Sequence, residues 1–157
     1  MAEGKSSSAV VVTHPVILYD AVCGLCDRLN QFVLKRDGGD HFRFASLQGE
    51  FASRVLQRHG VQAGLLDTVY VALSLGRPEE RLLGRSEAVI YILRDLGGLW
   101  RFTAALFKLL PSGLRDSLYN LVARHRYRVF GRHDVCLVPD AKWAGRFLDI
   151  QSDLKSR

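Results

Sequence analysis

The sequence is poor in cysteine and lacks long apolar runs, and both features narrow the classes of protein to consider. Only three cysteines occur in 157 residues, too few for the disulfide framework of a small secreted domain. No apolar run approaches the roughly 20 residues that a membrane-spanning helix needs, and the apolar segment 9–12 is too short for a signal-peptide core. Internal repeats and low-complexity tracts are also missing. We therefore expect a globular, cytoplasmic protein.

What the chain does contain is enough apolar material for a single domain with its own core. Hydrophobic residues make up 48% of the sequence, which excludes general disorder. The net charge of +6 is compatible with nucleic acid, an anionic membrane or an acidic protein as partner. Because the sequence has no stacking-aromatic pattern and no groove-reading motif, we expect no specific nucleic-acid partner.

Two cysteines separated by two residues form the most informative motif. Cys23 and Cys26 follow the apolar run 16–19 and open a stretch with helical apolar spacing. This arrangement places Cys23 at a helix N-terminus, where free N–H groups and the helix dipole favour a thiolate, the nucleophile in disulfide exchange. We expect Cys23 to be reachable from solvent and to attack a substrate disulfide, and Cys26 to resolve the mixed disulfide.

Asp20 precedes Cys23 by three residues and permits two interpretations. Its carboxylate is either the proton acceptor that tunes Cys26 or a turn carboxylate that accepts backbone N–H bonds. No bound cofactor is required, because thiol–disulfide exchange needs only the two sulfurs. The expected partners are a disulfide-containing substrate and an external thiol reductant.

The order of the predicted elements indicates an α/β fold, a mixed sheet flanked by helices. A Cys-x-x-Cys after the first strand of such a pattern points to a thioredoxin-like fold. Strands are predicted at 16–19, 42–45, 68–75 and 81–83, and helices at 24–36, 50–59 and from an N-cap at Ser86 to Leu96. The predicted organisation is a flexible lead (1–14), a core (15–98), a helical extension of the same domain (99–139) and a tail (140–157).

Several separate segments, in order, resemble the DCC family, a thiol–disulfide oxidoreductase-like group with an Asp-x-x-Cys-x-x-Cys motif. The resemblance implies a thioredoxin-like core, a helical C-terminal extension and an oxidoreductase role. Ala21 stands where the family usually has glycine. No proline occurs at 67–69, where thioredoxin-type oxidoreductases usually have a cis-proline, so we expect a trans connection and a differently shaped substrate groove. The matching segments are 17–26, 33–37, 42–48, 85–88, 126–131 and 136–139.

The C-terminal half leaves other roles open for several side chains. Cys23, Cys26, His133 and Cys136 offer the ligands of a Cys₃His zinc set as one alternative. We expect Cys136 instead to be a buried or partly exposed free thiol, and a reservoir that exchanges with the pair is a third alternative. Four arginines crowd one segment; they either lie on a solvated face or, packed near Cys23, help to hold a thiolate. They are Arg124, Arg126, Arg128 and Arg132, of which we single out Arg128 and Arg132 as accessory candidates.

The apolar stretch 99–110 is expected to be a core helix, with a membrane-surface helix as the alternative. Trp143, Phe147 and Leu148 are expected to form a short segment that folds back or binds a partner. These features support a second functional hypothesis, a non-enzymatic binding module for a protein or a membrane surface, whose cysteines are structural or bind zinc.

Overall fold

A four-stranded mixed sheet organises the computed structural model, which describes residues 12–62, 68–131 and 141–149. Its strands run in the order β2-β1-β3-β4. Strand β1 pairs in parallel with β2 and antiparallel with β3, which pairs antiparallel with β4. The strands are β1 (Val16–Tyr19), β2 (Arg43–Ser46), β3 (Tyr70–Leu73) and β4 (Arg81–Gly84). This mixed α/β arrangement confirms the predicted fold class and is consistent with a thioredoxin-like fold.

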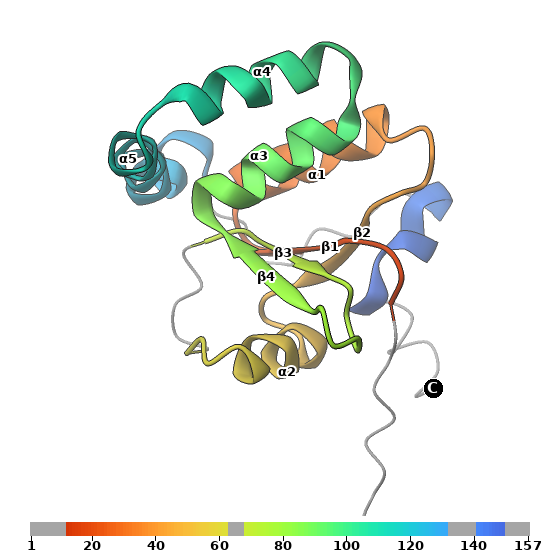
Figure 1. The fold of residues 1–157 in the computed structure, drawn as a ribbon. Coiled ribbons are helices and arrows are strands. Elements are labelled where there is room, and N and C mark those ends of the chain that lie inside the picture. The colour runs from red at the N-terminus through yellow and green to blue at the C-terminus, as the bar shows by residue number, and fades with distance from the viewer. Residues whose placement is uncertain (1–11, 63–67, 132–140, 150–157) are drawn as a thin grey trace, which may run out of the picture.

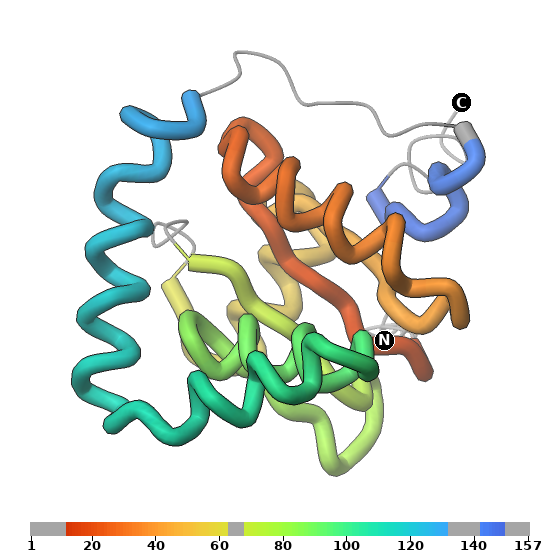
Figure 2. The backbone as a smooth tube through the Cα atoms, turned by 90° about the horizontal axis from the view of Figure 1, so that it is seen from above, coloured from red at the N-terminus to blue at the C-terminus, as the bar shows by residue number. Residues whose placement is uncertain are grey.

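Helices cover both faces of the sheet (Figure 1). Helix α2 lies on one face, and α1 and α3 lie on the other, with α4 outside α3 and farther from the sheet. Helix α5 runs along one side of the layer that α1, α3 and α4 form (Figure 2). The helices are α1 (Gly24–Arg36), α2 (Glu50–Arg58), α3 (Arg85–Leu96), α4 (Gly98–Leu109), α5 (Ser112–Phe130) and a 3-10 segment, η1 (Ala141–Arg146).

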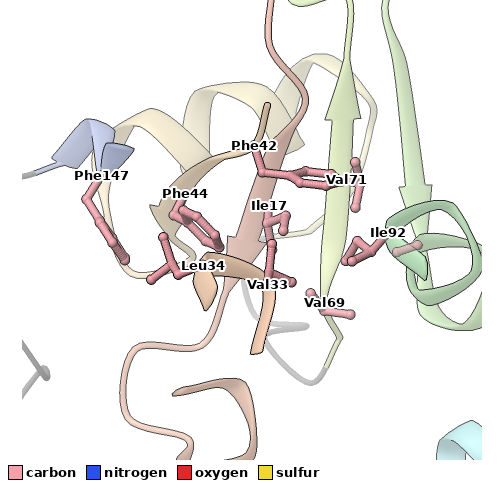
Figure 3. Packing of buried hydrophobic residues seen from close by; sticks show 10 residues of the cluster. Ile17, Val33, Leu34, Phe42, Phe44, Val69, Val71, Ile92 and Phe147 are labelled. Carbon is pink, nitrogen blue, oxygen red and sulfur yellow. The ribbon is translucent and has the colours of Figure 1, made fainter. Parts of the chain in front are cut away.

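The core has two halves because successive side chains of a strand point to opposite faces. Val16 and Leu18 pack toward α2, whereas Ile17 packs toward α1 and α3. The larger half contains Phe44, which stacks on Phe147 with ring centroids 5.0 Å apart (Figure 3). The C-terminal segment that carries Phe147 therefore folds back onto the domain, one of the two outcomes expected for it.

Two sequence predictions about the helices are wrong. Ser86 is not an N-cap, because α3 begins at Arg85 with Gly84 as its cap; the Ser86 hydroxyl donates instead to Asp116, at 2.6 Å. The stretch 99–110 forms a helix, but not a core helix. Among its residues in α4 only Ala104 is buried, because the sheet side of this layer is already occupied by α1 and α3.

The predicted lead (1–14) and the segment between α2 and β3 are described only in part. Val12 forms an isolated bridge with Leu75, its N–H lying 3.3 Å from the Leu75 carbonyl oxygen. Residues 1–11 and 63–67 lie outside the described residues. Among the described residues no peptide bond is cis, which includes the bond between Thr68 and Val69.

Candidate active site

The turn between β1 and α1 places the two cysteines at the start of the helix. Cys23 is the N-cap of α1 in an extended conformation, and its N–H donates to the Asp20 carbonyl at 3.2 Å. Cys26 lies in the first turn. Both are free thiols. The strand fixes where the chain leaves the sheet and the helix fixes the spacing of the sulfurs, as the sequence predicts.

The two thiols have opposite pKa shifts. A hydrogen bond from the Cys26 side chain is the largest influence on Cys23 and, with backbone N–H groups of Cys26 and Leu25 and the charge of Arg126, lowers the pKa of Cys23 to about 6 against the effect of burial. The same hydrogen bond, followed by burial, raises the pKa of Cys26 above its ordinary value. At neutral pH the pair therefore holds one negative charge, on Cys23, and one proton, on Cys26.

A buried cation from α5 completes this electrostatic environment. Arg126 is 4% exposed, and its Nη2 lies 3.3 Å from Oδ2 of Asp20. The sequence analysis offers packing near Cys23 as one of two alternatives for the arginine cluster that contains Arg126, but it singles out Arg128 and Arg132 rather than Arg126. The sequence does contain a signal for the inward position of Arg126, because Tyr119 and Arg126 are seven residues apart and therefore share one helix face. Tyr119 indeed faces the domain, where its hydroxyl accepts the Val69 N–H at 3.1 Å.

Asp20 is a hub of hydrogen bonds. Its Oδ1 accepts from the Val22 N–H at 3.1 Å and from Gln48 Nε2 at 2.7 Å. Its Oδ2 accepts from Arg126 and from the Tyr127 hydroxyl. This pattern matches the turn-carboxylate interpretation and adds a role the sequence does not suggest, which is to hold Arg126 beside the thiols.

Burial of Cys23 contradicts the expectation that its sulfur is reachable from solvent. Cys23 is 0% exposed and Cys26 is 8% exposed. The end of α5 lies against the start of α1 (Figure 2), where the Gly24 N–H donates to the Gly131 carbonyl at 3.2 Å. A Cβ atom at Gly24 would lie 2.2 Å from the Phe130 carbonyl oxygen. Only glycine fits in this position of the motif, because the two backbones approach so closely.

A mostly apolar cavity of about 310 Å³ opens beside the second thiol. Its walls come from α1, α3, α4 and α5, and Cys26 forms part of them. The volume is at the lower end of the range of small-molecule pockets. The dithiol thus lies between a covered side, at Cys23, and an open side, at Cys26.

The remaining candidate residues fall into two groups. Arg128 is exposed on α5. Arg132, His133 and Cys136 lie outside the described residues, so the proposed Cys₃His set is not tested. Within the described part of the chain, no group of three or more histidine, cysteine or acidic residues is arranged to hold a metal ion.

Comparison with known proteins identifies the family of this chain. The family model for DCC1-like thiol-disulfide oxidoreductase matches residues 17–132, most of the chain, including both cysteines and Arg126. The chain belongs to the DCC1-like thiol-disulfide oxidoreductase family. Membership supports a general redox role and confirms the resemblance noted from the sequence.

Two relatives, one bacterial and one from a plant, are similar to this chain over most of its length. The uncharacterized protein YuxK of Bacillus subtilis is 34% identical over 137 residues, covering 87% of this chain and 96% of the relative. The chloroplastic DCC family protein At1g52590 of Arabidopsis thaliana is 33% identical over 123 residues, or 78% of this chain and 69% of the relative. No solved structure matches significantly. In the described residues, no helix has the length and apolarity to cross a membrane.

Proposed function

We propose that the protein catalyses thiol–disulfide exchange, with Cys23 as the attacking thiolate and Cys26 as the resolving thiol. The observation that carries the proposal is the lowered pKa of Cys23, to about 6, at the N-terminus of α1. A thiol with that pKa is about nine-tenths ionised at pH 7, whereas an ordinary thiol is only a few per cent ionised.

The reaction proceeds in two exchanges. The Cys23 thiolate attacks one sulfur of a substrate disulfide, so that a Cys23–substrate disulfide forms and the other substrate sulfur leaves as a thiolate that takes up a proton. Cys26 then loses its proton and attacks the Cys23 sulfur, which forms the Cys23–Cys26 disulfide and releases the second substrate thiol. The substrate gains two electrons, the protein loses two, and an external thiol reductant restores the dithiol.

Arg126 and Asp20 act as positioning residues in this proposal. The Arg126 guanidinium stabilises the Cys23 thiolate through its charge, and Asp20 holds the guanidinium in place. Because Cys23 is buried, a bulky substrate reaches its sulfur only after the end of α5 moves away from Gly24.

Trapping of mixed disulfides tests the two roles. In a Cys136→Ala background, Cys26→Ser should accumulate Cys23-linked substrates in cells, because the resolving thiol is gone, and Cys23→Ser should accumulate none. The matched pair differs only in which sulfur remains. Equal yields from the two variants would contradict the assigned roles.

A second candidate function, association with an anionic membrane surface, is favoured by the outer face of α4. Leu99, Phe102 and Leu109 are 73%, 73% and 81% exposed, an unusual density of apolar side chains for a solvated helix. Arg101 and Lys108 also belong to α4, which contains no acidic residue. An exposed apolar stripe on a helix with cations and no acidic residue suits the interface of an anionic bilayer.

Vesicle flotation tests this second function. The protein should float with vesicles that contain phosphatidylglycerol and not with pure phosphatidylcholine, and Phe102→Ser should weaken the association. Failure to float with anionic vesicles would remove the membrane function and leave the redox proposal unaffected.

A further inference from the structure

The cavity beside Cys26 has a composition that points to a particular class of ligand. Most of its lining is aliphatic or aromatic, and the polar side chains among the lining residues are few. None of the lining residues is acidic. The polar or ionisable ones are Cys26, Ser86, Arg115, Tyr119 and Arg126.

The two arginines of the lining mark opposite ends of the cavity. Arg126 lies at the dithiol end, where Asp20 already balances its charge. Arg115 precedes it by eleven residues on α5, which separates their Cα atoms by about 16 Å at a rise of 1.5 Å per residue. The lining therefore extends along about three turns of α5, and Cys26 belongs to it.

The far end carries a cation, Arg115, that is hydrogen-bonded to a serine hydroxyl. Nε of Arg115 donates to the Ser86 hydroxyl at 3.0 Å. Among the described residues no direct ion pair includes Arg115, and the nearby Asp116 carboxylate is linked to it only through the shared Ser86 hydroxyl. A guanidinium at the edge of an apolar cavity is a favourable partner for a carboxylate or another small anion.

We propose that this cavity binds the substrate of the dithiol and that the substrate is a slender apolar disulfide with an anionic group at the far end of its chain. The proposal rests on the proposed function for its chemistry, and it adds the substrate class. The disulfide would lie against Cys26, which is hydrogen-bonded to Cys23, the apolar chain would lie between α1 and α5, and the anion would contact Arg115. Cys26 lines this cavity and Cys23 does not, so the ligand would meet the pair at Cys26, on the side that α5 leaves open.

Reduction of this ligand has the same electron balance as the proposed exchange between a substrate disulfide and the Cys23–Cys26 dithiol. The ligand disulfide takes two electrons and two protons to become a dithiol, and the protein dithiol becomes the Cys23–Cys26 disulfide. An external thiol reductant returns the protein to its starting state.

Binding of sodium octanoate, which has the chain and the anion but no sulfur, tests the cavity separately from the chemistry. Calorimetric titration of the reduced protein should show saturable 1:1 binding, and affinity should rise from butanoate to octanoate by up to about fourfold per buried methylene. Ala123→Phe, which fills the cavity from α5, should weaken octanoate binding at least tenfold. Ala105→Phe, on an exposed part of α4 outside this cavity, is the matched control and should bind as wild type does.

A separate pair of variants tests the contact between the ligand anion and Arg115. Arg115→Gln should lower the ratio of octanoate affinity to octanol affinity about tenfold, because a charge-assisted hydrogen bond is lost. Arg124→Gln, which removes an exposed cation from the same helix, should leave this ratio unchanged. If Ala123→Phe does not fold, Val122→Trp provides a second way to fill the cavity.

Reduction of lipoate and of bis(2-hydroxyethyl) disulfide completes the test. The ratio of kcat/KM for lipoate to that for the hydrophilic disulfide should fall at least tenfold in Ala123→Phe and stay constant in Ala105→Phe. Octanoate binding without reduction of either disulfide would keep the ligand assignment and overturn the proposed function. Absence of saturable octanoate binding, or binding insensitive to Ala123→Phe, would overturn this inference even if the hydrophilic disulfide is reduced.

Discussion

At the scale of single residues, the site depends on a charge that the protein keeps inside. Cys23 is a buried thiolate, and burial alone would raise its pKa. Three influences overcome that effect: the hydrogen bond from the Cys26 thiol, the backbone N–H groups of the first turn of α1, and the charge of Arg126. Asp20, in turn, holds Arg126 where it acts.

Removal of the buried cation should change both reactivity and stability. Arg126→Gln should raise the pKa of Cys23, because a favourable charge is lost. It should also lower the free energy of unfolding by about 3 kcal/mol, because Asp20 remains buried without its partner. The measurements are the pH profile of Cys23 alkylation and urea denaturation. Arg128→Gln, at an exposed position, is the control, and equal effects of both substitutions would contradict this role for Arg126.

The ionisation of Cys23 also predicts how stability depends on pH. Its folded pKa, about 6, lies below the unfolded value near 8.5. The stabilisation from ionised Cys23 is therefore complete above the unfolded value and is lost as pH falls toward 6. Between pH 6 and 8.5, the free energy of unfolding of the reduced protein should rise by up to about 1.4 kcal/mol per pH unit relative to Cys23→Ser.

Above pH 8.5, the free energy of unfolding should instead fall as the pH rises. The folded pKa of Cys26 is raised, so its unfolded thiol ionises first and the unfolded state gains from higher pH. Urea denaturation in excess reductant measures both limbs. A stability difference between wild type and Cys23→Ser that does not change from pH 6 to 8.5 would contradict the pKa assignment.

The sequence predicts part of this residue-level account. The positions of Cys23 and Cys26 follow from a strand-to-helix turn, because local spacing determines them. The burial of Cys23 and the role of Arg126 do not, because both depend on how α5 packs against α1, more than 100 residues away from Asp20 in the chain. Local periodicity carries no information on such long-range contacts.

At the scale of elements, the junction of α1 and α5 controls access to Cys23. The Gly24 N–H donates to the Gly131 carbonyl, and the Phe130 carbonyl oxygen occupies the space that a Cβ atom at Gly24 would need. The last turn of α5 thus covers the motif through backbone atoms, which cannot rotate away as a side chain can.

Gly24→Ala should loosen this cover. The added methyl group overlaps backbone, a conflict worth about 1.4 kcal/mol or more, so Cys23 alkylation at pH 7 should accelerate at least about tenfold. Circular dichroism should report a folded protein, because alanine favours the helix more than glycine does. Gly113→Ala, where a Cβ atom meets nothing within 4 Å, is the control on α5. A folded Gly24→Ala protein with the wild-type alkylation rate would contradict the cover.

Predictions that rest on local sequence patterns are more accurate here than predictions that depend on tertiary contacts. The strand at 16–19 and the helix at 24–36 match β1 and α1, because their apolar spacing and flanking turns are strong local signals. The predicted burial of 99–110 is wrong, since an apolar helix does not reveal whether another element remains to cover it.

At the scale of the whole molecule, the C-terminal segment completes the core. Phe147 is 5% exposed, stacks on Phe44 and meets Tyr19 edge-on at 6.1 Å. Arg146 adds an ion pair to Asp37, at 3.3 Å, after the end of α1. Residues 141–149 are therefore part of the folded unit, and their contacts reach the same strand, β1, that leads to the dithiol.

Phe147→Ala should destabilise the protein by about 3 kcal/mol, the usual loss for a buried phenylalanine. Urea denaturation measures this loss, and Leu99→Ala, at a 73% exposed position, is the control that should cost little. Equal stability of the Phe147→Ala variant and wild type would show that the C-terminal segment does not pack on β1 and β2.

The pH dependence of Cys23 alkylation, followed by peptide mass spectrometry on the reduced protein, tests the central claim most directly. The rate constant should rise with pH to a plateau, with a midpoint near 6, and Cys26 should stay unmodified over that range. A midpoint at or above 8.5, the ordinary thiol value, or preferential modification of Cys26 would contradict the assignment of Cys23 as the nucleophile.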